Sequence, residues 1–242
     1  STFASAVGRS FYSQILPSNS VNLAWSAWSI QWLSRAPMPV PDHLLAAHSH
    51  DGEVRAAYER QAARDWHEFV AFRGRELSPG GRLVVMTMAV DEDGDVGYRP
   101  LFDATSETLV DLVDRKVLTD DESRAMSIPI TARRTRDFLS PFAPSGTFEK
   151  LTVQHLEVFG GEDRFWAQYR IDKKAKEFGD RWAAFLRIIA FPTLAAALPV
   201  DRRRGFVDQL SAGVAERLTA APTEVRIPLA AVVIEKQQRA NH

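Results

Sequence analysis

The most constraining feature of this sequence is a long amphipathic segment that leads through a glycine turn into a short apolar run. Over residues 51–77, apolar residues recur at every third or fourth position and polar residues fill the other face, which predicts an α-helix. The Ser-Pro-Gly-Gly sequence at 78–81 is expected to end this helix, and residues 83–90 are predicted to form a buried strand. A helix, a turn and a buried strand form the unit of a parallel sheet, so the sequence predicts an α/β fold.

The rest of the chain alternates between strand and helix patterns, with no internal repeat and no long linker. Strands are predicted over residues 22–33, where helix is the alternative, and over 148–159 and 224–235. Helices are predicted over residues 107–116, 131–139, 173–198 (bent at Pro192) and 203–218. Pro228 favours an edge position or a bulge for the last strand. The last two predicted strands, one of which is expected to be antiparallel, are typical of the far edge of a larger sheet.

Composition excludes several classes of protein. The 242 residues include 30 Lys and Arg against 31 Asp and Glu, and this balance argues against a nucleic-acid partner. The chain has no cysteine, which excludes disulfides, thiol nucleophiles and Cys-ligated zinc. No apolar run approaches the roughly 18 residues that a membrane helix needs, and residues 1–10 lack the pattern of a signal peptide. We therefore expect a cytoplasmic protein without a membrane partner.

Common catalytic and metal-binding motifs are absent. Neither the P-loop nor the dinucleotide-binding fingerprint occurs, and no Gly-x-Ser-x-Gly elbow anchors a hydrolase triad. The acidic residues 91–95 are interpreted as a solvated turn because their glycine is misplaced for a calcium loop. His43, His48 and His50 lack the spacing of a zinc site, so no metal is predicted. The lone His155, in a predicted strand, is expected to be a packed residue.

The aromatic residues near the start of the chain form the most unusual pattern. Trp25, Trp28 and Trp32 fall within eight positions and alternate with serine and glutamine. A single tryptophan here would most simply be part of an aromatic core. Ligand pockets, however, combine aromatic walls with a few polar donors, so this cluster indicates a binding site.

Several motifs, taken in order along the chain, resemble the SABATH methyltransferases. These enzymes use S-adenosylmethionine to methylate small carboxylic acids or, in some members, xanthine ring nitrogens. The matching motifs are Ser-Phe-Tyr at 10–12, Ser-x-Trp-Ser-x-x-Trp-Leu-Ser-x-x-Pro at 26–37, Pro-Gly-Gly-Arg at 79–82, Ile-Pro at 128–129, Gly-Thr-Phe at 146–148 and Arg-Ile-Ile-Ala-Phe-Pro at 187–192. The resemblance spans nearly the whole chain.

The resemblance implies a class I (Rossmann-like) methyltransferase sheet with a helical cap over the acceptor pocket. The cap segments are expected near residues 12–50 and 96–147. In the family, a glycine-rich cofactor loop, an acidic ribose ligand and an early glutamine precede the Ser-Phe motif, and none of them occurs in these 242 residues. We therefore expect residues 1–242 to be the C-terminal two-thirds of a single methyltransferase domain, without the N-terminal part of the sheet.

The resemblance also assigns roles to individual residues. Ser10 and Phe11 match the positions that contact the adenosine end of the S-adenosyl-L-methionine cofactor. The residues that match the walls of the acceptor pocket are Trp28, Gln31, Trp32, Met88, Phe102, Leu186 and Ile189. Some members carry Asp-Ser-Phe-Asn before Ile-Pro, at a position associated with magnesium. This chain has Arg-Ala-Met-Ser at 124–127, which again predicts no metal.

The chemistry of carboxyl methylation is consistent with the absence of a catalytic acid–base pair. A carboxylic acid with a pKa of about 4–5 is already ionised at neutral pH, so it needs no general base. Trp32 is predicted to orient the carboxylate, because an indole N–H is a donor only. Gln31 either binds a second heteroatom of the acceptor or points at backbone.

The sequence therefore predicts methyl transfer to a small aromatic or terpenoid acid. The alternatives are N-methylation of a small heterocycle and a catalytically idle acid-binding remnant. A homodimer is expected because the family commonly dimerises. The identity of the acceptor is left open.

Overall fold

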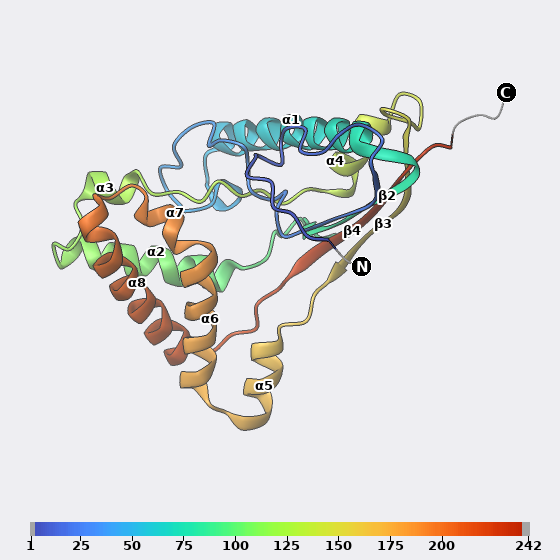
Figure 1. Ribbon diagram of the computed structural model, residues 1–242. Coiled ribbons are helices and arrows are strands. Elements are labelled where there is room, and N and C mark those ends of the chain that lie inside the picture. The colour runs from blue at the N-terminus through green and yellow to red at the C-terminus, as the bar shows by residue number, and fades with distance from the viewer. Residues whose placement is uncertain (1–2, 239–242) are drawn as a thin grey trace.

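The computed structural model describes residues 3–238 as a mixed α/β fold built on a four-stranded sheet (Figure 1). The strands are β1 (Val21–Ala27), β2 (Leu77–Met88), β3 (Leu151–Gly160) and β4 (Pro228–Lys236), in the order β1-β2-β4-β3. The helices are α1 (Gly52–Glu76), α2 (Arg99–Asp114), α3 (Asp120–Arg124), α4 (Thr135–Leu139), α5 (Arg164–Asp172), α6 (Ala175–Ile189), α7 (Phe191–Ala195) and α8 (Val200–Ala220). Figure 1 shows α1 alongside the sheet and α2, α5, α6, α7 and α8 grouped beyond one end of it.

The helix–strand unit predicted from the sequence is confirmed, with one difference at the turn. Asp51 caps α1 by accepting hydrogen bonds from the backbone N–H groups of Glu53 and Val54. The helix ends at Glu76, but β2 begins at the next residue, so the Ser-Pro-Gly-Gly segment lies inside the strand. β1 and β2 are parallel, as the pattern predicted. Close pairing requires glycine at position 81, where a Cβ would lie 2.7 Å from the carbonyl oxygen of Val21.

The prediction that Pro228 favours an edge position or a bulge is wrong. β4 is antiparallel to both β2 and β3 and lies between them, so it is an inner strand. Pro228 is its first residue, where a missing N–H disturbs the ladder least. Its carbonyl still accepts a hydrogen bond from the N–H of Ala89, at 3.0 Å.

β3 is therefore an edge strand, and this position overturns the expectation that His155 is packed. The His155 side chain is 52% exposed and lies 3.4 Å from a carboxylate oxygen of Glu157.

The predicted helices are present with different bounds. Of the segment 131–139, only α4 is helical, because residues before it pair in extended form, including a bridge between Ala89 and Arg133. The segment 173–198 divides at Ala190 into α6 and α7, and Pro192 stands at the start of α7. The predicted bend is thus confirmed. The sequence patterns missed α3 and α5, which have no buried residues that would make their pattern periodic.

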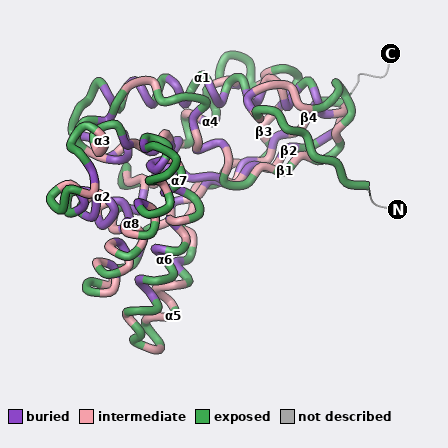
Figure 2. The backbone as a smooth tube through the Cα atoms, turned by 60° about the vertical axis from the view of Figure 1, so that its left-hand side comes forward, coloured by how far each residue is buried: buried purple, intermediate pink, exposed green. Residues whose placement is uncertain are grey.

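Buried residues, coloured purple in Figure 2, form three apolar clusters, of which a sheet core and a helical core are the larger two. The first is formed by α1 packing on the sheet through residues such as Trp66, Val85 and Val232. The second, here called the helical cluster, contains buried residues of α2, α6, α7 and α8 together with Met88 from the end of β2. The carboxyl ends of β1 and β2 thus point toward the helical cluster, and this junction positions the candidate site.

Candidate functional site

The candidate site is built on the loop that follows β1, residues 28–34, here called the tryptophan loop. The loop starts with Trp28 in a left-handed backbone conformation (φ 57°), and the Trp28 N–H donates to the carbonyl of Met86 at 2.9 Å. The loop therefore leaves the carboxyl end of one parallel strand while bonded to its neighbour. In open α/β sheets, ligands bind at this edge.

Gln31 is fully engaged within the protein. Its side-chain N–H donates to the carbonyl of Trp28 at 2.8 Å, and its side-chain oxygen accepts from the hydroxyl of Thr87 at 3.1 Å. The residue is 5% exposed, and its carbonyl accepts from the N–H of Thr131. Of the two possibilities for Gln31, this geometry favours the one in which it points at backbone and closes the turn.

Trp32 has a fixed backbone and a free donor. Its backbone bridges Ile130, and its carbonyl accepts a hydrogen bond from the hydroxyl of Tyr12. The indole N–H of Trp32 donates to no group within residues 3–238, and the same is true of the buried indole N–H of Trp182. The indole N–H of the core residue Trp66, in contrast, donates to the carbonyl of Phe138 at 3.0 Å. Trp32 packs half-buried against the helical cluster. A rigidly held donor beside an apolar wall is suited to fixing one oxygen of a carboxylate.

Three residues that hold the tryptophan loop were not predicted from the sequence. The Tyr12 hydroxyl also contacts the carbonyl of Ile30, and burial raises the pKa of Tyr12 to about 12, so the phenol stays a donor. Asp65 accepts from the N–H and the hydroxyl of Ser34 at 2.8 and 2.7 Å. Arg133 donates to the carbonyl of Ile30 at 2.7 Å. Two of the three had a sequence signal: Tyr12 belongs to the Ser-Phe-Tyr motif, and Asp65 is a charged residue beside the buried positions of the predicted helix.

The other predicted acceptor residues lie in three different elements. Met88 in β2, Phe102 in α2 and Leu186 in α6 are all buried members of the helical cluster, against which Trp32 packs. The structure thus brings these residues into one apolar cluster, although they are far apart in sequence. Ile189, at the end of α6, is 40% exposed, and Trp28 is 44% exposed. These two side chains lie at the surface rather than in the cluster.

Ser10 and Phe11 lie outside the helical cluster, and Phe11 packs against the sheet core. Ser10 is exposed, and its hydroxyl accepts from the N–H of Tyr12 at 3.2 Å. Phe11 is half-buried and lines a groove of about 540 Å³ that also contains Leu23 and Trp25 of β1. Arg73 of α1 holds this segment by donating to the carbonyl of Phe11 at 2.8 Å.

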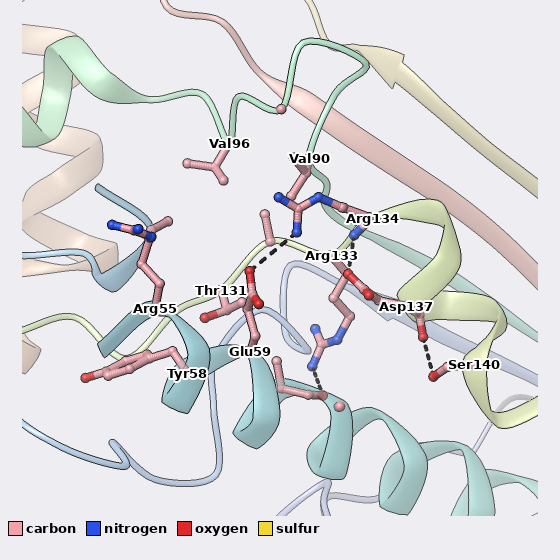
Figure 3. A pocket seen from close by; sticks show the side chains of 15 residues that line it. Arg55, Tyr58, Glu59, Val90, Val96, Thr131, Arg133, Arg134, Asp137 and Ser140 are labelled. Carbon is pink, nitrogen blue, oxygen red and sulfur yellow. Dashed lines mark hydrogen bonds and ion pairs between the residues drawn. The ribbon is translucent and has the colours of Figure 1, made fainter. Parts of the chain in front are cut away.

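A separate pocket of about 450 Å³ lies between α1, the residues after β2 and the segment 131–140 (Figure 3). None of the predicted cofactor or acceptor residues lines it. Its walls carry three arginines, Arg55, Arg133 and Arg134, and two acids, Glu59 and Asp137.

The described residues contain neither a metal-binding cluster nor a membrane-spanning helix. Residues 3–238 contain no group of three or more His, Asp or Glu side chains placed to hold a metal ion. No helix in that range has the length and hydropathy to cross a membrane.

Comparison with known proteins places the chain among methyltransferases. Residues 1–237 match the family model described as SAM dependent carboxyl methyltransferase. The chain is 28% identical over 202 residues to the indole-3-acetate O-methyltransferase 1 of Arabidopsis thaliana, covering 78% of this chain and 51% of that protein. It is 26% identical over 181 residues to the probable 7-methylxanthine methyltransferase 5 of Theobroma cacao, covering 69% of this chain and 49% of that protein. The chain thus spans about half the length of these curated relatives.

A solved structure shows the same fold. A loganic acid methyltransferase with SAH superposes with a TM-score of 0.75 at 19% identity, covering 99% of this chain and 68% of that chain. The expected methyltransferase fold is therefore confirmed.

Proposed function

The chain belongs to the SABATH family of S-adenosylmethionine-dependent carboxyl methyltransferases, and from this we propose that it binds the methyl acceptor of such an enzyme. The proposed reaction transfers a methyl group to the carboxylate of a small aromatic or terpenoid acid. The observation that carries the proposal is the indole N–H of Trp32, which has no acceptor within residues 3–238 and lies on a hydrogen-bonded loop at the carboxyl end of β1.

Trp32 is proposed to orient the acceptor rather than to exchange protons with it. The acceptor carboxylate is ionised at neutral pH, so the protein needs only to orient the acceptor and to exclude water from the site. One oxygen accepts the Trp32 N–H, which leaves the other free to attack. Met88, Phe102, Leu186 and Ile189 are proposed as the apolar walls that hold the rest of the acid.

Gln31 is proposed to act indirectly. Because both polar ends of its side chain bond within the protein, it fixes the start of the tryptophan loop relative to β2. A direct contact between Gln31 and the acceptor stays a prediction.

The residues before β1 fit one end of the cofactor. An exposed hydroxyl at Ser10 and an aromatic ring at Phe11 on an open groove are groups suited to a ribose and an adenine, and we propose that they contact the adenosine end. When bound, S-adenosyl-L-methionine supplies an electrophilic methyl group on a sulfonium centre. The exposed face of Trp28 is proposed to favour that positive charge, a contact worth about 0.5–2 kcal/mol.

The outer edge of β1 is proposed as the junction with the rest of the sheet. Leu23 and Trp25 are each 67% exposed there, which is unusual for a strand of a stable sheet. We propose that residues 1–242 form the acceptor-binding part of one methyltransferase domain, with cap segments near 12–50 and 96–147. A cytoplasmic homodimer is also proposed; light scattering coupled to size-exclusion chromatography tests its mass.

The proposal is tested by acid binding and by methyl transfer. Calorimetry with indole-3-acetate and benzoate is expected to show binding to the chain, and Trp32→Phe is expected to weaken it about tenfold, the loss of one charge-assisted hydrogen bond. Trp166→Phe in α5 is the matched control and is expected to bind normally. Equal affinity in Trp32→Phe and wild type would remove Trp32 from the site.

Two alternatives are distinguished by the same samples. The similarity to a probable 7-methylxanthine methyltransferase makes N-methylation the first alternative. Tighter binding of a neutral xanthine than of the acids would favour N-methylation. Binding of acids without any heat from S-adenosylhomocysteine would favour an acid-binding remnant. Mass spectrometry of a methyl ester formed from S-adenosylmethionine would support the proposed reaction directly.

A further inference from the structure

The pocket in Figure 3 has a buried floor and a charged rim. The floor includes Tyr58 of α1, Val90, Ala132 and Arg133, all of them buried, whereas Arg55 and Glu59 on the rim are exposed. Its volume of about 450 Å³ is within the range of small-molecule sites, roughly 300–1,000 Å³.

Arg133 is the unusual member of the floor. It is 1% exposed, and its two terminal nitrogens donate to the carbonyls of Ile30 at 2.7 Å and Ala62 at 2.9 Å. Its Nε–H is buried and has no hydrogen-bond partner, and no carboxylate lies within ion-pair distance of it among residues 3–238. The groups that favour its charge are Tyr12, Asp65 and Asp137.

The charge of Arg133 is therefore incompletely compensated. The oxygens of Asp65 accept from Ser34 and Gln61, and Asp137 accepts from the N–H of Arg134. Burial lowers the pKa of Arg133, which reflects the unfavourable environment of its charge. A buried guanidinium is normally paired with an anion, so this one points to an anion that the protein itself does not supply.

The rim offers two further cations. Arg134 is 41% exposed and pairs with Glu59 at 3.4 Å, as Figure 3 shows. Such an exposed pair contributes little to stability, so an incoming anion displaces Glu59 easily. Arg55 donates one bond to the carbonyl of Ser49 and keeps further N–H groups for a ligand.

We propose that this pocket is a second ligand site, which binds a small organic anion. Its carboxylate or phosphate group lies beside Arg133 and between Arg55 and Arg134, and its apolar body lies against Val90 and Val96. The site is distinct from the tryptophan loop and does not depend on the function proposed above.

The test uses NMR of the chain labelled with ¹⁵N-arginine. The buried Nε–H of Arg133 is expected to give a resolved signal, identified by its loss in Arg133→Lys. Benzoate and inorganic phosphate, titrated separately, are the probes. At least one is expected to shift this signal saturably, and the tighter of the two decides between a carboxylate and a phosphate ligand.

Substitutions of exposed residues test where the anion binds, because they are not expected to destabilise the fold. The double variant Arg55→Gln, Arg134→Gln is expected to weaken binding about tenfold or more. Arg170→Gln removes the same charge from an exposed position of α5, outside the pocket, and is expected to bind as wild type does, as is Trp32→Phe. The proposal is overturned if neither anion shifts the signal, if the double variant binds equally well, or if Trp32→Phe abolishes the shift.

Discussion

Lowering the pH is expected to destabilise the protein through His48, a buried residue of the segment that precedes α1. His48 is 8% exposed, and its Nδ1 accepts a hydrogen bond from the guanidinium of Arg99 at 3.1 Å. Burial, and then the positive charge of Arg99, lower the pKa of His48 from 6.5 to about 4. A protonated ring would lose this bond and face a like charge in a desolvated site.

The sign and size of the effect follow from this shift. Because the unfolded chain binds the proton more tightly, the stabilisation is complete above pH 6.5 and is lost as the pH falls toward 4. This difference in pKa between the folded and unfolded states corresponds to about 3 kcal/mol of unfolding free energy. About 2 kcal/mol of it is lost between about pH 7 and about pH 5.

Urea denaturation followed by tryptophan fluorescence measures this loss. In His48→Gln, the glutamine still offers Arg99 an acceptor but does not titrate. Between about pH 7 and about pH 5, the free energy of unfolding of this variant is therefore expected to fall by about 2 kcal/mol less than that of the wild type. His155→Gln, which replaces a 52% exposed histidine, is expected to follow the wild type. If wild type and His48→Gln lost stability in parallel, the burial argument would be refuted.

Two further substitutions test the supports of the site and of the sheet. Tyr12→Phe removes the side-chain donor to the carbonyl of Trp32 and one of the two donors to the carbonyl of Ile30, which keeps its bond from Arg133, so it is expected to lower stability by about 1–3 kcal/mol and to weaken acid binding. Calorimetry checks this against Tyr169→Phe, and unchanged acid affinity would count against the supporting role. Gly81→Ala places a Cβ 2.7 Å from the Val21 carbonyl and is expected to cost about 1–3 kcal/mol. Gly160→Ala, which meets nothing within 4 Å, is the control, and equal melting temperatures for the two variants would refute the packing argument.

Sequence patterns predicted the elements whose burial is periodic. The helix over 51–77 corresponds closely to α1, which buries one side along its length. The strand over 148–159 corresponds closely to β3, where Val153, Leu156 and Val158 pack partly buried against the sheet core. The bend at Pro192 was predictable because proline cannot continue a helix. α3 and α5 escaped prediction because none of their residues is buried.

The position of β4 could not be read from the sequence. Pro228 removes one N–H whether its strand lies inside the sheet or at its edge, and only the pairing partners decide between the two. The same limit applies to His155, whose exposure depends on β3 being the edge strand.

For the candidate site, the sequence by itself determined the residue types: an aromatic cluster around Trp32, no cysteine, and motifs of a carboxyl methyltransferase family. Only the tertiary structure decided which of these groups are free to act. Gln31 and Trp32 look equally available in the sequence, yet both polar ends of the Gln31 side chain are bonded, whereas the indole N–H of Trp32 has no acceptor among the residues that the structure describes. Hydrogen-bond partners such as Tyr12 and Thr87 come from distant segments, and a donor's freedom depends on whether such a partner lies within reach.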